Sequence, residues 1–447
     1  MAQLIVSISG IRGIIGDGLG PRETVRFGLA FGTHLKHGKV VMGRDSRPSG
    51  PMLTAALRAG LLATGCGVVD VGILSTPGIS LMVGHLAAAG GAIITASHNP
   101  PPYNGIKMLS PIGTALNRTQ GQAVVDLYQR EAFAQVGTAG MAGLEFRDDA
   151  AAIHVDRVCT LIDVERIRAA AFRVAVDPVN GAGGREMQML LERLGCTVRM
   201  INGEPTGRFG RPAEPVPEHL GDLGKAVSEA GAAVGMALDP DADRLALVDE
   251  TGRPIGEEYT LALACRHRLT QVRGPLAANL STSRLMDDVA LEAGVPLYRT
   301  PVGEVNVAEA ILSRGCVLGG EGNGGVIDPR VAPVRNSLAG AAMILEMMAM
   351  RGMPLSELAA ELPVYSMVKD KVTLSVADPA AVLRAVRQKY SDAKIDERDG
   401  LHLSWDDGWL HIRASNTEPI LRILAEADDE PTARRWVAEV KAVAGGA

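Results

Sequence analysis

Three aspartates alternate in the short loop DPDADR, which follows the apolar run AAVGMAL. If the loop is extended, Asp239, Asp241 and Asp243 point the same way, and their carboxylates repel one another unless a cation lies between them. Such oxygen ligands suit Mg²⁺ or Ca²⁺. A calcium loop is the strongest alternative, since Glu250 occupies the twelfth position from Asp239, but Arg244 stands where that loop needs glycine. We therefore favour magnesium over calcium, and both over a merely solvated acidic turn.

A second candidate is Ser97, in the loop TASHNPPPYNGIK after the strand-like run AIIT. Three prolines and Gly105 predict a rigid, non-helical backbone that would present the hydroxyl as a nucleophile from a fixed frame. Taken alone, the stretch favours an ordinary loop in which Ser97 and Asn99 cap backbone groups. A serine–histidine hydrolase is disfavoured, because His98 should point to the opposite face of an extended chain and no GxSxG motif is present.

A turn near the C-terminus, RASNTEP, combines several groups that can bind phosphate: Arg413, Ser415, Asn416 and Thr417. A guanidinium, two hydroxyls, an amide and backbone N–H groups within one turn are the inventory of a phosphate cradle. A hairpin turn stabilised by its own serine and asparagine is equally compatible with this stretch.

Glycine-rich segments supply the remaining candidates. The run GGEGNGG, residues 319–325, has too much glycine for a strand interior, and its Glu321 and Asn323 could hydrogen-bond sugar hydroxyls. The turns SGIRGIIG and GRDSR place arginines beside glycines, where they could contact phosphate or pair with a local carboxylate. Of these, Arg44 and Asp45 are expected to brace the site.

The elements that must position these loops follow a repeated rhythm. Strand-like and helical stretches alternate over 39–95, 173–238 and 275–320, which predicts three parallel α/β units. Ligand sites of open α/β sheets lie at the carboxyl ends of strands, so the three polar loops should converge on one cleft. After 366 the pattern becomes strand, helix, hairpin, strand and closing helix, which predicts an α+β unit.

Composition narrows the class of protein. The 447 residues exceed what one hydrophobic core holds, and we expect three or four domains. A net charge of -6 without a basic stripe argues against nucleic acid as a partner. The N-terminus lacks a signal peptide and no apolar run is long enough for a membrane span, so we expect a cytoplasmic protein with no membrane partner. Five scattered cysteines without CxxC, and histidines without HExxH, disfavour zinc.

The chain resembles the α-D-phosphohexomutases over nearly its whole length. The resemblance rests on four motifs that occur in that family's order and at its spacing: TASHNP, DPDADR, GEGNGG and RASNTEP. The resemblance implies three α/β mixed-sheet domains and a C-terminal α+β domain, similar to TATA-binding protein, around a central cleft. We expect a monomer or homodimer that binds a small-molecule sugar phosphate. The predicted domains carry the phosphoserine loop, the metal loop, the sugar-binding loop and the phosphate-binding turn, over residues 1–149, 150–252, 253–365 and 366–447.

The resemblance also implies roles for single residues. Ser97 would carry the phosphate and, with Asp239, Asp241 and Asp243, hold Mg²⁺. The positive groups near the transferring phosphoryl would be Lys107, Arg12 and Arg244. The residues that bind the sugar and the non-reacting phosphate would be Gly303, Glu304, Glu321, Asn323, Arg413, Ser415, Asn416 and Thr417.

The implied activity is transfer of phosphate between the 6- and 1-positions of a hexosamine or hexose, through a 1,6-bisphosphate that also serves as activator. Two departures bear on the sugar. Many relatives have histidine where Gly325 stands, and many that act on glucose or mannose have histidine at Glu304, where glucosamine-type members often carry an acid. We therefore favour glucosamine, with mannose and glucose as the alternative and a metal-dependent sugar-phosphate phosphatase less favoured. The segment RNSLAG, where that subgroup has GRD before a helix, has no physical explanation in the sequence.

Overall fold

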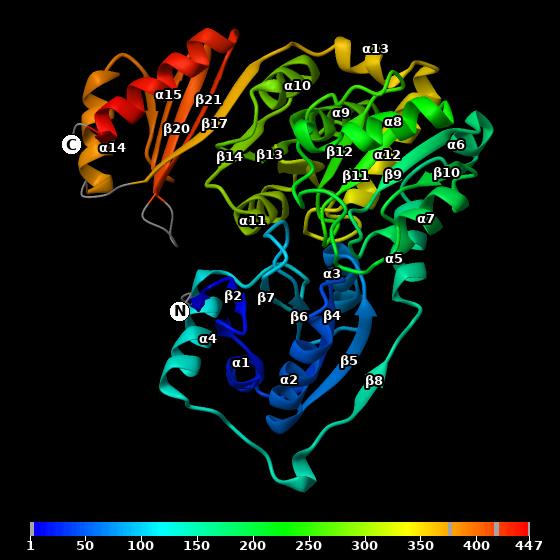
Figure 1. The fold of residues 1–447 in the computed structure, drawn as a ribbon, viewed down its shortest axis with the longest axis vertical. Helices are drawn as coiled ribbons and strands as arrows, with labels where there is room; N and C mark the ends of the chain where they lie inside the picture. Colours follow the sequence, from blue (N-terminus) through cyan, green and yellow to red (C-terminus); the bar gives the residue numbers. More distant parts are fainter. Residues whose placement is uncertain (1–3, 374–377, 415–419, 446–447) are drawn as a thin grey trace.

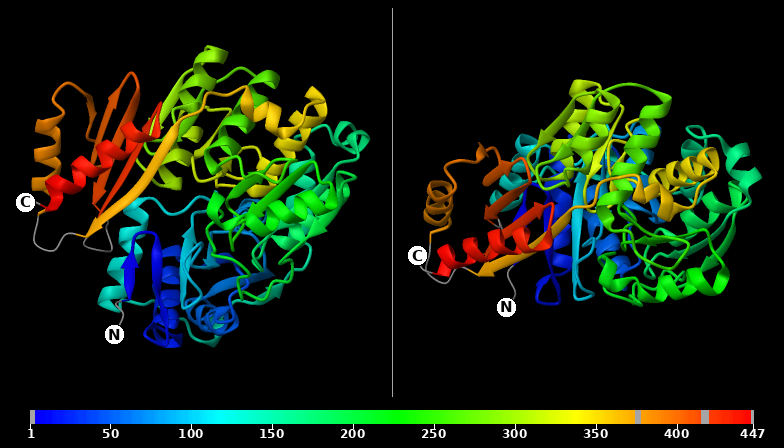
Figure 2. Two further views of the ribbon diagram at one scale, coloured as in Figure 1. Left: turned by 45° about the horizontal axis from the view of Figure 1, so that its top comes forward. Right: turned by 90° about the horizontal axis from the view of Figure 1, so that it is seen from above.

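The computed structural model describes residues 4–373, 378–414 and 420–445. Within these residues the chain forms four sheets, each with its own helices. Three are mixed sheets of α/β domains, and the fourth is an antiparallel sheet of an α+β domain, as predicted. We number the domains 1 to 4 by these sheets, and their boundaries stay predictions. Figures 1 and 2 show the domain 4 sheet standing beside domain 3, away from domain 2.

Domain 1 is built on eight strands in the order β1-β2-β7-β6-β4-β5-β8, with β3 beside β2. The strands are β1 (Ile5–Ser7), β2 (Gly10–Ile15), β3 (Gly18–Leu19), β4 (Gly38–Arg44), β5 (Cys66–Ile73), β6 (Gly90–Ile94), β7 (Tyr103–Leu109) and β8 (Leu144–Phe146). The helices are α1 (Pro21–Leu35), α2 (Gly50–Ala63), α3 (Thr76–His85) and α4 (Arg118–Arg130). Strands β6 and β7 run antiparallel and are joined by the Ser97 loop, so this loop leaves the sheet at the carboxyl end of β6.

Domains 2 and 3 repeat one layout, in which three parallel strands are closed by a short antiparallel strand. Domain 2 contains β9 (Arg173–Asp177), β10 (Thr197–Met200), β11 (Val234–Leu238), β12 (Leu245–Val248), α5 (Ala150–Cys159), α6 (Val164–Ala170), α7 (Gly184–Arg193) and α8 (Gly221–Ala230). Domain 3 contains β13 (Leu276–Asn279), β14 (Leu297–Thr300), β15 (Leu318–Glu321), β16 (Gly325–Ile327), α9 (Glu257–Gln271), α10 (Leu285–Ala293), α11 (Glu304–Arg314), α12 (Ser337–Arg351) and α13 (Leu355–Ala360). One hydrophobic core runs through both domains, because α12 is apolar nearly all round and packs on helices of each.

Domain 4 has the strand order β17-β21-β20-β19-β18, all antiparallel. It contains β17 (Ser366–Thr373), α14 (Pro379–Lys389), β18 (Lys394–Asp396), β19 (Leu401–Trp405), β20 (Gly408–Ala414), β21 (Ile420–Ala427) and α15 (Glu430–Gly445). The predicted hairpin is β19–β20, with His402 opposite His411. Helices α14 and α15 bury Val386, Trp436 and Val440 against the sheet in a core of its own.

Two sequence expectations need correction. The glycine-rich run GGEGNGG does enter strands, since Gly319 and Gly320 lie in β15 and Gly325 begins β16. Glycine is required there by close backbones: a Cβ on Gly320 would lie 2.1 Å from the carbonyl oxygen of Gly325. The apolar strand expected directly after DPDADR is β12, whereas the short antiparallel strand β16 was not foreseen. No helix in the part of the chain that the structure describes combines the length and apolar character needed to cross a membrane.

Candidate active site

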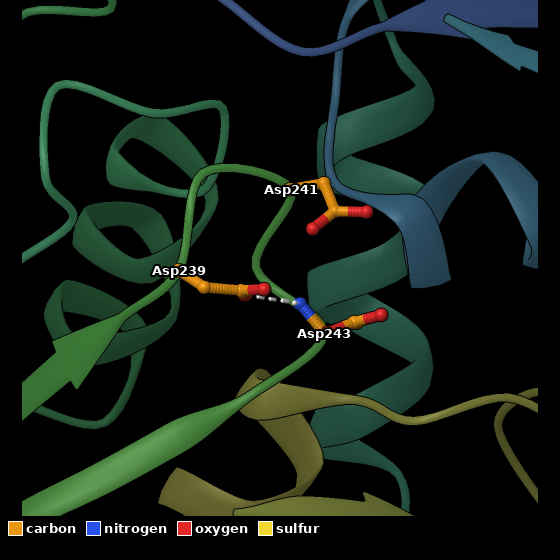
Figure 3. A group of neighbouring side chains, drawn as sticks. All are labelled: Asp239, Asp241 and Asp243. Atoms are coloured by element: carbon orange, nitrogen blue, oxygen red, sulfur yellow. Dashed lines mark hydrogen bonds between the residues drawn. The ribbon is translucent and has the colours of Figure 1, made fainter. Parts of the chain in front are cut away.

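The three aspartates lie in the turn between β11 and β12 of domain 2 (Figure 3). The segment is a tight turn rather than an extended loop, because Ala242 adopts φ +54° and its N–H donates to the Asp239 carbonyl at 3.0 Å. The carboxylates still converge: one ligand oxygen from each of Asp239, Asp241 and Asp243 lies within 4.8 Å of the others. All three side chains are fully buried.

Each aspartate has one carboxylate oxygen fixed by the protein. Asp239 Oδ1 accepts backbone N–H groups of the turn, and Asp241 Oδ2 accepts Thr76 Oγ1 at 2.8 Å and Lys107 Nζ at 2.7 Å. Asp243 Oδ2 accepts Arg335 Nη2 at 2.5 Å. In contrast, Asp241 Oδ1 and Asp243 Oδ1 are buried with no hydrogen-bond partner among the described residues. Buried carboxylate oxygens of this kind suit a hard cation, so the triad could bind a metal ion.

The electrostatics of the turn point the same way. Burial, followed by the charges of Asp243 and Asp241, raises the pKa of Asp239 well above its usual value. Burial alone would lower the pKa of Lys107, but Asp241 and Asp243 raise it overall, so this lysine stays protonated. The three aspartates are thus packed closely enough to oppose ionisation of Asp239, with Lys107, Arg244 and Arg335 as the cations that face them.

Ser97 meets this cluster from domain 1. Its side chain is 5% exposed, and Oγ lies 3.4 Å from Asp239 Oδ2. The residue has φ +50°, a conformation that costs a non-glycine residue energy and that its surroundings must impose. Its N–H donates to Thr95 Oγ1 at 2.8 Å. The structure thus brings the predicted phosphate carrier to the predicted metal ligands.

The fixed frame of the Ser97 loop comes from Arg47, which the sequence analysis did not single out from GRDSR. Arg47 is 1% exposed and pairs with Asp45 at 3.0 Å. Its two Nη groups donate at 2.6 to 3.0 Å to four carbonyls of the loop, those of Ser97, Asn99, Pro100 and Tyr103. Asp45 also accepts Thr95 Oγ1 at 2.7 Å, so its expected bracing role agrees with its contacts.

The expectation that His98 points away from Ser97 is wrong. Because Ser97 adopts the left-handed conformation, His98 Nδ1 lies 3.3 Å from Ser97 Oγ. However, this nitrogen also lies 3.0 Å from Arg244 Nη2, which donates to it. Burial and then Arg244 lower the pKa of His98 to about 2, so the ring is neutral. His98 therefore holds an arginine in place and is no general base at neutral pH.

Two predicted arginines flank Ser97. Arg244 is held between His98 and Glu214, with a 2.9 Å contact to the Glu214 carboxylate. Arg12, on β2, donates through Nη1 to Asn99 Oδ1 at 2.9 Å. Burial lowers the pKa of Arg12, but a guanidinium remains charged at physiological pH. Like Arg47, these two arginines contact the Ser97 loop, while Lys107 contacts Asp241 of the metal loop.

The two predicted sugar-binding segments, residues 303–304 and 321–323, meet the metal loop through Arg335, which was not predicted as a site residue. Its guanidinium donates to Asp243 and to Glu321 Oε2, and its Nε lies 3.0 Å from Glu304 Oε2. The available signal was RNSLAG, the segment without an explanation. Asn336, the next residue, caps α12 by accepting the N–H groups of Leu338 and Ala339 at 3.0 and 3.1 Å. The arginine and the helix cap together explain that segment.

The carboxylates of Glu321 and Glu304 differ in their hydrogen bonds and in the direction of their pKa shifts. Glu321 Oε1 accepts Asn279 Nδ2 at 2.8 Å and the Gly303 N–H at 3.2 Å. Against the effect of burial, Arg335 and Asn279 hold the pKa of Glu321 below its usual value. Burial instead raises the pKa of Glu304 to about 6, although Arg335 works against this. Asn323 is close by, with Nδ2 3.5 Å from Glu321 Oε2.

The predicted phosphate turn is described only in part. Arg413, at the end of β20, pairs through Nε with Asp399 Oδ2 at 2.8 Å. Ser415, Asn416 and Thr417 lie outside the described residues. The roles assigned to all these side chains stay predictions.

Comparison with known proteins covers the whole arrangement. Four family models match consecutive parts of the chain: phosphoglucomutase/phosphomannomutase alpha/beta/alpha domains I, II and III at residues 4–135, 152–252 and 256–365, and the C-terminal domain at 367–443. A phosphoglucomutase/phosphomannomutase of Thermococcus kodakarensis is 41% identical, over 96% of this chain and 95% of the relative. A probable phosphoglucosamine mutase of Methanopyrus kandleri is 39% identical, over 95% and 94%.

Solved structures share the architecture. A crystal structure of a phosphoglucomutase/phosphomannomutase family protein from Burkholderia thailandensis superposes with a TM-score of 0.86 at 27% identity, covering 98% of this chain and 97% of that one. A putative phosphomannomutase from Thermus thermophilus superposes with a TM-score of 0.84 at 26% identity, covering 99% of each chain. The likeness therefore extends through all four domains.

Proposed function

The chain belongs to the phosphoglucomutase/phosphomannomutase family of phosphohexomutases, and on that premise we propose that it interconverts glucosamine 6-phosphate and glucosamine 1-phosphate, with Ser97 as the phosphate carrier. The observation that supports this most directly is the position of Ser97 Oγ, 3.4 Å from Asp239 in a buried cluster that can hold a cation. A phosphoserine in this place would lie against three aspartates and three positive side chains.

The proposed cofactor is Mg²⁺, held by Asp239, Asp241 and Asp243 and by the phosphate of Ser97. When bound, it would supply positive charge to the transferring phosphoryl group. The donor set fits it, since the buried Oδ1 atoms of Asp241 and Asp243 have no partner among the described residues.

The chain's own residues position the sugar phosphate and neutralise the charge of the transferring phosphoryl group. The P–O bond to Ser97 Oγ breaks as a bond forms to the free hydroxyl of the sugar phosphate, and the hydroxyl proton is released while Ser97 regains one. Lys107, Arg12 and Arg244 stabilise the charge of the phosphoryl group in flight. The resulting 1,6-bisphosphate turns around and returns its other phosphate to Ser97. Burial of Ser97 limits the access of water, which favours transfer over hydrolysis.

The preference for glucosamine rests on Glu304, whose carboxylate lies at the edge of the sugar loop and could pair with the ammonium of the substrate. The Methanopyrus relative bears the matching name. Glucose and mannose phosphates are the second candidate, because the Thermococcus relative is named for them. A phosphatase remains the third.

The test begins with the carrier. Incubation with glucose 1,6-bisphosphate should add one phosphate to the wild-type protein, mapped to the Ser97 peptide by mass spectrometry, and none to Ser97→Ala. Rates on glucosamine, glucose and mannose phosphates then rank kcat/KM, with glucosamine expected highest. Unmodified Ser97 after this incubation would argue against the carrier role, and steady release of inorganic phosphate would favour the phosphatase.

A further inference from the structure

The carboxylate of Asp399, in domain 4, contacts two predicted substrate-binding segments. One is the Val302–Glu304 stretch of domain 3 and the other is Arg413 of domain 4. Asp399 lies in the turn between β18 and β19. Its Oδ2 accepts the N–H of Val302 at 2.7 Å, next to the predicted substrate-binding residues Gly303 and Glu304. The same oxygen lies 2.8 Å from Nε of Arg413, the predicted phosphate-binding arginine. We call residues 302–304 the sugar loop.

The turn that carries Asp399 is itself fixed. Its carbonyl oxygen accepts His411 Nε2 at 2.7 Å, and His411 Nδ1 lies 2.8 Å from Ser281 Oγ in domain 3. Burial lowers the pKa of His411 to about 4, so the ring is neutral; with Nε2–H donating, Nδ1 accepts the Ser281 hydroxyl. Gly400 has φ +76°, and a Cβ there would lie 2.3 Å from the Ile412 carbonyl oxygen, so the turn packs closely on β20.

A long arginine side chain loses rotamer freedom when it binds phosphate, and a partner that holds it in advance reduces that cost. The closest approach of Asp399 to Arg413 is at Nε, whereas arginine binds phosphate bidentately through its terminal nitrogens. A carboxylate at Nε can thus orient the guanidinium without using the edge that grips the ligand. Because the same carboxylate also accepts the Val302 N–H, the orientation of Arg413 depends on the position of the sugar loop.

We propose that Asp399 is a positioning residue that aligns Arg413 for the substrate phosphate and ties this alignment to the sugar loop at Val302–Glu304. The proposal deepens the proposed function and rests on it for the role of Arg413. It predicts that substrate is gripped well only when the domain 4 turn is docked on the sugar loop.

Other contacts keep domain 4 attached when Asp399 is altered. Glu426 accepts the Arg284 N–H at 2.8 Å, Lys369 pairs with Glu257 at 2.8 Å, and Arg398 donates to the Arg299 carbonyl at 2.9 Å. None of these involves a predicted substrate-binding residue. A change at Asp399 should therefore act on phosphate binding rather than on docking of the whole domain.

The test compares Asp399→Asn with Asp396→Asn. Asparagine at 399 can still accept the Val302 N–H but lacks the charge that holds Arg413. Asp396, the last residue of β18 before this turn, is the matched control, since it pairs with Arg398 at 2.6 Å and, among the described residues, contacts neither residues 302–304 nor Arg413. We expect Asp399→Asn to raise KM for the sugar phosphate about tenfold, equally for glucosamine, glucose and mannose phosphates, with kcat at saturation nearly unchanged. Asp396→Asn should match wild type.

Two further measurements keep the outcome decisive. If Asp399 acts through Arg413, the double variant with Arg413→Lys binds no more weakly than Arg413→Lys alone, whereas additive losses overturn the proposal. Calorimetric titration with glucose 6-phosphate reports binding whether or not turnover occurs. Wild-type binding without mutase turnover would thus count against the proposed function alone, while equal affinities of wild type, Asp399→Asn and Asp396→Asn would overturn the role of Asp399.

Discussion

Two junctions between domains are built in different ways. Around the metal loop, domains 1, 2 and 3 meet through fully buried polar groups. Thr76 of domain 1 binds the Asp241 backbone at 2.9 Å, and Ser337 of domain 3 donates to the Ala242 carbonyl at 2.7 Å. Beside them, the Glu186 carboxylate accepts hydrogen bonds from the Ser75 N–H, the Ser75 hydroxyl and His154 Nδ1. Asn336 Nδ2 is hydrogen-bonded to His154 Nε2. We call these four residues the buried network.

The junction of domain 3 with domain 4 combines a few buried polar contacts, at Glu426 and His411, with partly exposed ion pairs. Lys369 is 44% exposed where it pairs with Glu257, and Arg284 pairs with an Asp428 that is 60% exposed. A cavity of about 1200 Å³, bordered by Arg299, Arg398 and Trp409 among others, opens between the two domains. Domains 2 and 3 share one hydrophobic core, whereas the core of domain 4 is built from its own residues.

The contrast assigns different tasks to the two junctions. The proposed phosphoryl transfer would require Ser97 and the aspartates to be placed to within a fraction of an ångström, and a buried, hydrogen-bonded junction can provide this. Binding and release of a bisphosphate that must turn around need a part that can move, and exposed ion pairs contribute little to resist such motion. If the proposed function holds, the chemistry lies at the stiff junction and the phosphate grip at the loose one.

The largest effect is expected inside the stiff junction, at the metal loop. Asp241→Asn should lower kcat about 10³-fold, because the charge that would hold the cation beside the phosphoserine is reduced. The fold should persist, since the asparagine can keep its bond to Thr76. Mutase rate and Mn²⁺ affinity by calorimetry measure the two parts. Turnover at the wild-type rate would contradict both the metal site and the task assigned to this junction.

The next effect is on stability and sets the two junctions against each other. Glu186→Ala removes the acceptor of three buried groups, His154 Nδ1, the Ser75 hydroxyl and the Ser75 N–H, and should cost about 3 kcal/mol of the free energy of unfolding. The matched change at the loose junction, Glu257→Ala, removes a partly exposed pair and should cost under about 1 kcal/mol. Urea unfolding of both variants gives the values. Equal losses would mean that the junctions do not differ as described.

The local chemistry of the site was largely predictable from the sequence, because it lies in short segments. DPDADR places three carboxylates within five residues, and AIIT running into ASHNP marks a strand that ends at the Ser97 loop. The alternation of apolar runs with helical stretches likewise predicted the four-domain fold class, which is confirmed.

What joins these segments was not predictable, because its members are far apart in the chain. Arg335 meets Asp243 across 92 positions, and Ser75 meets Glu186 across 111. No local pattern indicates such pairs. The left-handed Ser97, which brings His98 beside it, also has no signature, since the surrounding structure imposes it. Strand β16 was missed because its three residues are too few to show alternation.

A smaller effect concerns Arg335, which links the metal loop to the two predicted sugar-binding segments within the stiff junction. Arg335→Lys keeps the charge but cannot contact three carboxylates at once, so Asp243 loses its orientation. We expect Mn²⁺ affinity to fall about tenfold. Arg330→Lys is the control, because Arg330 is bonded to Asp328 on the same loop. Calorimetric titration separates the two, and an unchanged affinity in Arg335→Lys would remove Arg335 from the metal site.

The last effect lies at the loose junction and depends on pH. Glu258 faces Lys369, Glu257 and Glu426 between domains 3 and 4, and burial raises its pKa from 4.5 to about 8, although Lys369 opposes this. Folding therefore takes up a proton between these values: the stability from Glu258 is full below pH 4.5 and lost as pH rises through about 8. Glu258→Gln resembles the protonated form, so relative to wild type it should gain about 1 kcal/mol per pH unit between about pH 5 and 8. Urea unfolding of both proteins across that range measures the difference. A difference that stays constant with pH would show that Glu258 keeps its ordinary pKa, and that the loose junction does not exclude water enough to shift a buried acid.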